Sequence, residues 1–256
     1  FMVHGIGGRV FAYRNFASQL DPDQPVYGVQ AATRPDGTPI HSSVNSMAQH
    51  YAEEIRALQP EGPYFVGGYS LGGWFAYEVA ARLRDDRTQV TLILLASYPY
   101  CPVPWRARGA YAAVKILNVG LHLRVLGGLE LRAIAPYVVA KSKGLFRTLI
   151  RPSGAHILPA ARQLPAEGPH GDAPGAVTDY FVAVASRHLI STTDCDVELI
   201  VADRPRTLVR AKIMFWRQLV RGELRIHPIR ATHAGMFDDE RLAHIVSGIT
   251  AASAAS

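Results

Sequence analysis

Cysteine is scarce in this sequence, which holds only Cys101 and Cys195 among its 256 residues. Two cysteines so far apart build no disulfide framework and match no metal-ligand spacing. A small domain that is stabilised mainly by disulfides or by a zinc ion is therefore excluded. The expected setting is reducing and cytoplasmic, and no metal site is predicted.

Long hydrophobic runs are also missing. No apolar stretch reaches the roughly 18 to 20 residues that cross a bilayer, so no membrane span is predicted. The start of the chain has no basic segment, apolar core or cleavage site of a secretory signal. Phe1 stands where an initiator methionine is expected, which suggests a piece of a longer polypeptide.

Acidic residues are few over residues 105–151. This stretch contains one acidic residue, Glu130, and nine basic residues: Arg106, Arg108, Lys115, Arg124, Arg132, Lys141, Lys143, Arg147 and Arg151. The net charge is +6. Such a face suits an acidic protein, an anionic membrane or nucleic acid, but no nucleic-acid motif accompanies it. Solvated helix faces explain it equally well.

Apolar patterning predicts one large α/β domain over residues 1–256. Hydrophobic residues make up 48% of the chain, enough for a sizeable core. Short apolar runs predict strands at residues 1–4, 25–30, 64–68, 89–96, 197–202 and 224–229. Helical spacing predicts helices at residues 10–20, 42–58, 72–84, 176–189, 208–219 and 240–249. This alternation indicates a doubly wound, mostly parallel sheet.

The alternation stops over about residues 100–175. The first part of this stretch has helical spacing without strands, and residues 151–175 are rich in proline and glycine. Because strands resume afterwards, the stretch is predicted to be a helical insertion that forms a lid above the sheet.

The chemistry-bearing motif is Gly68-Tyr69-Ser70-Leu71-Gly72, a G-x-S-x-G pattern between a predicted strand and a predicted helix. This context is typical of a nucleophile elbow, where a sharp turn exposes the serine oxygen at a helix N-terminus. Ser70 is therefore the predicted nucleophile. The N–H groups of Leu71 and of Ile6, in the glycine-rich loop after the first strand, are the predicted oxyanion donors.

The predicted base is His233, one of ten histidines. In folds that carry a nucleophile elbow, the catalytic histidine follows the serine and the acid in the sequence. His233 fits this order, because it lies between the last predicted strand and the last predicted helix. His227 falls inside that strand and is predicted to be structural. His4 is expected beside the entrance.

These residues resemble the thioesterase domains of nonribosomal peptide and polyketide synthases, which have the α/β-hydrolase fold. The matching stretches are residues 1–8, 23–31, 59–73, 76–80 and 216–233. The resemblance covers about residues 1–100 and 195–250 and leaves the predicted lid out.

The resemblance implies that a carrier protein, upstream in the same polypeptide, presents an acyl or peptidyl chain on its phosphopantetheine arm. Ser70 would take the acyl group while His233 takes the proton. Water, or an internal amine or hydroxyl, would then release an acid or a ring. The implied domain has no cofactor of its own and belongs to secondary-metabolite biosynthesis.

The chain departs from the family at the third triad member. Similar domains carry an aspartate where this sequence has Ala96, followed by Ser97. The acid is predicted to have moved to Asp203, at the end of the next strand, although an ion pair with Arg204 or Arg206 would explain Asp203 equally. Asp194 and Asp196 are weaker candidates.

Two other interpretations stay open. The domain works as a Ser–His dyad, or with position 96 deliberately changed; or it has drifted to a slower or different acyl transfer. The rival functions are a general serine esterase or lipase and a degenerate module that only binds an acyl chain.

Overall fold

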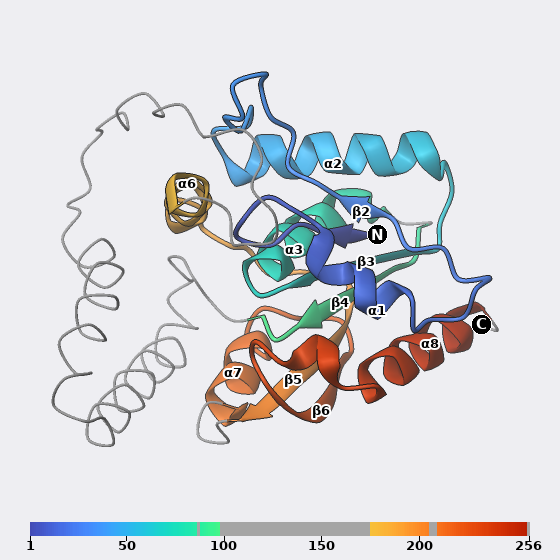
Figure 1. The fold of residues 1–256 in the computed structure, drawn as a ribbon. Helices are drawn as coiled ribbons and strands as arrows, with labels where there is room; N and C mark the ends of the chain where they lie inside the picture. The colour runs from blue at the N-terminus through green and yellow to red at the C-terminus, as the bar shows by residue number, and fades with distance from the viewer. Residues whose placement is uncertain (86–87, 98–174, 205–208, 255–256) are drawn as a thin grey trace, which may run out of the picture.

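One parallel sheet of six strands forms the centre of the computed structural model, which describes residues 1–85, 88–97, 175–204 and 209–254 (Figure 1). The strands lie in the order β2 (Gly28–Val29), β1 (Met2–Val3), β3 (Tyr64–Tyr69), β4 (Val90–Leu95), β5 (Asp196–Arg204) and β6 (Leu224–Thr232). Each neighbouring pair runs parallel. The predicted α/β sheet is confirmed.

Helices cover both faces of this sheet, and α2 and α8 lie on opposite sides of it in Figure 1. One apolar cluster holds residues of α2 (Val44–Leu58), α3 (Leu71–Leu83), α6 (Gly175–Ser186) and α7 (Val209–Trp216). A second cluster holds residues of η1 (Phe11–Tyr13), α1 (Arg14–Ala17), η4 (Met236–Asp238) and α8 (Arg241–Ala254). All of β4 is buried, as the continuous apolar run of a strand covered on both faces requires.

The strand order reverses between β1 and β3. From β1 the chain adds β2 on one side, and it then returns to place β3 on the other side. The chain therefore leaves the carboxyl ends of β1 and β3 in opposite directions, which makes this place the topological switch point of the sheet, where ligands bind in open α/β sheets. Ile6 follows β1 and Ser70 follows β3, so both predicted site residues lie at this switch point.

The predicted insertion leaves the sheet continuous, because β4 and β5 are direct neighbours with Leu95 opposite Ile200. The predicted lid at about residues 100–175, its basic segment and Cys101 lie outside the described residues, apart from Gly175, the first residue of α6. Within the described ranges, none of the helices combines the length and the apolar character that crossing a membrane requires.

Candidate active site

Ser70 occupies the turn between β3 and α3 in a backbone conformation that side chains rarely adopt. Its φ is 57° and its ψ is −120°, and a strained conformation of this kind costs about 1–3 kcal/mol. Glycines permit the turn: a Cβ at Gly68 would lie 2.2 Å from the Gly72 carbonyl oxygen, and a Cβ at Gly72 would lie 2.6 Å from that of His4. The Ser97 hydroxyl donates to the Ser70 carbonyl oxygen at 2.8 Å and fixes the elbow.

The His233 imidazole lies beside the Ser70 hydroxyl, although the two residues are far apart in the sequence. His233 directly follows β6, and its Nε2 lies 3.1 Å from the Ser70 Oγ across 163 positions of the chain. The Gly235 N–H donates to the Thr232 Oγ1 at 3.1 Å, which closes the turn that carries the imidazole. The distance is within the range of a nucleophile–base hydrogen bond.

The surroundings of His233 favour its neutral, proton-accepting form. Burial, and secondly the positive charge of Lys212, lower the pKa of His233 to about 4. Lys212 is itself buried on α7, and its burial lowers the pKa of its amine. The imidazole is therefore unprotonated at neutral pH, as a general base must be.

This pKa leads to a prediction for the pH profile. Acylation needs the neutral imidazole, so kcat/KM is expected to fall only as the pH drops through about 4. The Lys212→Met variant removes a positive charge and is expected to raise the pKa of His233, which moves this acid limb to higher pH. Steady-state kinetics on a soluble acyl thioester between pH 3.5 and 8 would measure the acid limb of the wild type and that of the Lys212→Met variant.

The Arg217→Met variant is the control, because it removes an exposed cation just beyond α7 and is expected to leave the limb in place. A wild-type limb at or above the ordinary histidine pKa of 6.5 would contradict the role assigned to burial.

The loop after β1 is held by His4, which is fully buried and so does not line the entrance, contrary to the prediction. Burial lowers its pKa to about 4. Its Nδ1 lies 2.8 Å from the Gly5 carbonyl oxygen, an acceptor, so Nδ1 donates and Nε2 accepts from the Tyr51 hydroxyl at 2.9 Å. In a trans peptide the N–H points opposite to the C=O. The Ile6 N–H therefore points away from His4.

The two predicted oxyanion donors lie on neighbouring elements. Leu71 is the first residue of α3, so its N–H belongs to the first turn, where helical N–H groups have no partner within the helix. The loop with Ile6 runs beside the elbow, since a Cβ at Gly5 would lie 3.9 Å from the Tyr69 carbonyl oxygen. One N–H group thus comes from the loop after β1 and the other from the first turn of α3.

Asp203 lies near the end of β5, beside the strand that leads to His233. The register pairs Ala202 with Ile229 and Arg204 with Thr232, with an irregularity between them. The Asp203 Oδ1 is buried and makes no hydrogen bond to any described residue. The side chains of Arg204 and Arg206, its alternative partners, lie outside the described set. Ala96 is buried at the end of β4 with φ 44°.

The weaker candidates lie elsewhere. Asp196 begins β5, at the end of the strand opposite Asp203, and Asp194 pairs with Arg84 at 3.9 Å. His227 lies within β6 and contacts the buried Glu198 Oε2 at 2.6 Å, in keeping with its predicted structural role.

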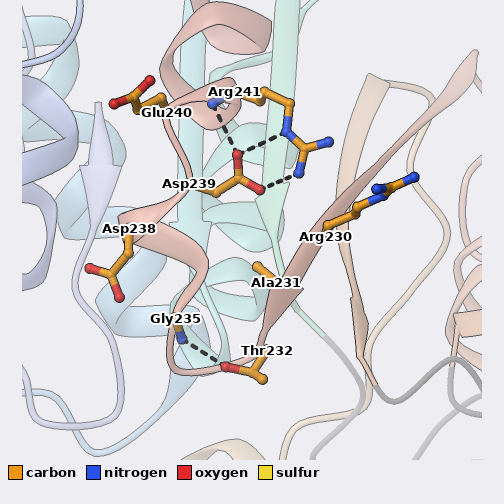
Figure 2. A pocket seen from close by; sticks show the side chains of 8 residues that line it. All are labelled: Arg230, Ala231, Thr232, Gly235, Asp238, Asp239, Glu240 and Arg241. Carbon is orange, nitrogen blue, oxygen red and sulfur yellow. Dashed lines mark hydrogen bonds and ion pairs between the residues drawn. The ribbon is translucent and has the colours of Figure 1, made fainter.

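An open pocket of about 560 Å³ lies next to the His233 turn, at the end of β6 and the start of α8 (Figure 2). Its lining residues are Arg230, Ala231, Thr232, Gly235, Asp238, Asp239, Glu240 and Arg241. Figure 2 shows the ion pair between Asp239 and Arg241. The Arg241 Nε donates to the Asp239 Oδ1 at 2.9 Å, and the Arg241 Nη2 donates to the Asp239 Oδ2 at 2.5 Å. Charges of both signs line this pocket, which is unsuited to an apolar acyl chain.

Two residues near the imidazole were missed at the level of sequence. Tyr69, the variable residue of the motif, contacts His233, and Lys212 acts on its pKa. Helical spacing could have revealed Lys212, because it lies one turn before the buried Trp216 on the same face of α7. Across the described ranges, no group of three or more His, Cys, Asp or Glu side chains could hold a metal ion.

Comparisons with known proteins agree with this architecture. A family model described as a thioesterase domain matches residues 1–252. The polyketide synthase PksR of Bacillus subtilis (strain 168) is 44% identical over 101 residues, which cover 39% of this chain and 4% of PksR. The nonribosomal peptide synthetase btyA of Aspergillus terreus (strain NIH 2624 / FGSC A1156) is 27% identical over 94% of this chain and 26% of its own length. The chain therefore spans only a minor part of these relatives.

Solved structures show the same fold. ClbQ from the colibactin NRPS/PKS pathway superposes with a TM-score of 0.61 at 14% identity, over 100% of this chain and 98% of ClbQ. The NocB thioesterase domain from the nocardicin cluster gives a TM-score of 0.58 at 23% identity, over 99% of this chain and 92% of that one. The predicted fold class is confirmed.

Proposed function

The chain belongs to the thioesterase domain family, and from that membership we propose that it releases an acyl or peptidyl chain from a carrier protein through an acyl-serine intermediate on Ser70. The single observation that carries this proposal is the 3.1 Å approach of the His233 Nε2 to the Ser70 Oγ on a strained elbow. A serine so placed can lose its proton as it attacks a carbonyl carbon.

Acylation uses both side chains. The Ser70 Oγ attacks the thioester carbonyl carbon while the His233 Nε2 takes the hydroxyl proton. The N–H groups of Ile6 and Leu71 hold the negative oxygen of the tetrahedral intermediate. The C–S bond then breaks, the imidazolium returns the proton to the departing phosphopantetheine thiol, and the acyl group stays on Ser70.

In deacylation the imidazole again acts first as a base and then as an acid. His233 takes a proton from water, or from an amine or hydroxyl of the acyl chain itself, and this nucleophile attacks the ester carbon. The proton then passes to the Ser70 oxygen as the ester bond breaks. Water yields a free acid, and an internal nucleophile yields a ring. Phosphopantetheine enters only as part of the substrate.

Asp203 is proposed as the acid that orients and balances His233. Its support is its place near the end of β5, next to the strand that leads to His233. In the structure the Asp203 Oδ1 is buried and makes no hydrogen bond to a described residue, and the Asp203 charge acts on Arg241. The proposed partner is an acyl or peptidyl carrier domain of a secondary-metabolite synthase. Residues 1–256 are proposed to form one domain, since strands from both sides of the predicted insertion share one sheet.

The test compares substrates and labels the serine. The same acyl group is offered as a carrier-bound thioester and as a simple alkyl ester, and products are identified by mass spectrometry. We expect the carrier thioester to be turned over with much the higher kcat/KM, and a fluorophosphonate to attach to Ser70. A preference for the free ester would instead indicate a general esterase. No turnover together with no label on Ser70 would indicate a binding module.

A further inference from the structure

Tyr69 contacts the imidazole of His233 in two ways. The two rings stack, with centroids 4.8 Å apart and planes inclined by 25°. The Tyr69 hydroxyl also donates to the backbone carbonyl oxygen of His233 at 2.6 Å. One side chain therefore fixes both the backbone that carries the imidazole and the face of its ring.

The Tyr69 ring is itself held in place. Phe237 packs on it edge to face, with centroids 4.9 Å apart, so the tyrosine lies in contact with Phe237 and with His233. The Tyr69 N–H donates to the Tyr13 hydroxyl at 2.9 Å, and this hydroxyl donates to the Val3 carbonyl oxygen at 2.7 Å. The support of the imidazole thus rests on strands β1 and β3.

We propose that Tyr69 is the positioning residue for the base, which its stacked ring and its bond to the His233 carbonyl oxygen hold against the Ser70 hydroxyl. The proposal rests on the function proposed above. It assigns a role to the variable residue of the G-x-S-x-G motif in a chain with Ala96 at the usual acid position.

The stacking also acts on charge. When the His233 Nε2 takes the serine proton, the ring becomes a cation that lies over the negative face of the Tyr69 π-system. A cation over an aromatic face gains roughly 0.5–2 kcal/mol, which corresponds to about 2- to 30-fold in rate if it is realised only in the transition state. The tyrosine therefore favours the charged intermediate more than the resting site.

The experiment separates the two contacts with two variants. Tyr69→Phe keeps the ring and loses the hydroxyl bond, and it is expected to lower the acylation rate constant by roughly 2- to 10-fold. Tyr69→Leu loses both contacts, and a fall of roughly 10- to 100-fold is expected. Because Tyr69 acts through His233, KM should change little while kcat falls.

Two tyrosines provide matched controls. Tyr64→Phe, on the same strand, loses a hydroxyl bond to the Gln59 carbonyl oxygen at 2.9 Å. Tyr27→Leu loses a ring stacked on Phe1 with centroids 5.3 Å apart. Both control variants should keep the wild-type rate per active site.

The readout is fluorophosphonate labelling followed to completion. The endpoint counts folded sites, and the rate reports how the base is positioned. Equal endpoints with slower labelling in the order wild type, Tyr69→Phe, Tyr69→Leu would support the proposal. Unchanged rates per site in both Tyr69 variants, with the wild type active, would overturn it. A wild type that neither labels nor turns over would overturn the proposed function itself.

Discussion

Ser70→Ala is expected to lower kcat on a carrier-bound thioester by about 10⁴- to 10⁶-fold. The hydroxyl is the only atom group lost, and without it the acyl group has no oxygen to join. Alanine keeps the buried volume close to that of serine, so the thermal midpoint of unfolding should stay within a few degrees. Product formation over hours, followed by liquid chromatography with mass spectrometry, would measure the remaining rate.

His233→Ala should fall to a similar level, and the Ser70→Ala/His233→Ala double variant should fall little further, because the two groups act as one unit. Ser18→Ala is the matched control: this exposed hydroxyl donates to the Asn15 carbonyl oxygen at 2.9 Å, and its loss should leave kcat unchanged. Additive losses in the double variant would mean that Ser70 and His233 do not share a step.

Asp203→Asn is expected to lower kcat by about 10³- to 10⁴-fold, since an amide can neither balance the imidazolium nor select the correct tautomer. Asp194→Asn removes a carboxylate at the opposite end of β5 and should have no effect on kcat. The rates should be measured under the conditions used for Ser70→Ala. Retention of more than half the activity by Asp203→Asn would remove Asp203 from the triad.

A rescue sharpens this prediction. Ala96 has a φ of 44°, a left-handed conformation that aspartate tolerates better than alanine. Ala96→Asp introduces a carboxylate at the position where similar domains carry theirs. In the Asp203→Asn background it is expected to restore kcat by at least about 10-fold. A double variant no faster than Asp203→Asn alone would show that position 96 cannot support His233 in this chain.

Local pattern was enough to predict the sheet and the sharp turn that carries Ser70. The run Val90–Leu95 has the length and the continuous apolar character of a buried strand, and Ser70 is marked by the glycines that its turn requires. The weakest predictions were at the edges. The strand expected at residues 25–30 is only β2, Gly28–Val29, and the helix expected at residues 10–20 is a 3-10 turn followed by α1. Short edge elements depend on neighbours that the local sequence does not specify.

Contacts between residues that lie far apart in the sequence could not be predicted from local pattern. Tyr69 and His233 are 164 positions apart, and only the pairing of strands brings them together. The burial of His4 depends on Tyr51, Phe75 and Phe181, which lie on other elements. The shift in register between β5 and β6 at Ala202 and Arg204, beside Asp203, could not be predicted from the sequence of β5 alone.

The adjacency of β4 and β5 has a consequence for how such domains diversify. The connection between them ends with α6, which packs in the core, whereas the stretch before α6 does not enter the pairing of the two strands. The entropy of closing a flexible loop grows only with the logarithm of its length, and doubling the length costs about 0.6 kcal/mol. Insertions and deletions before α6 leave the pairing of the sheet unchanged, and with it the approach of His233 to Ser70. This stretch can therefore vary in length while the strands that carry the two residues keep their places.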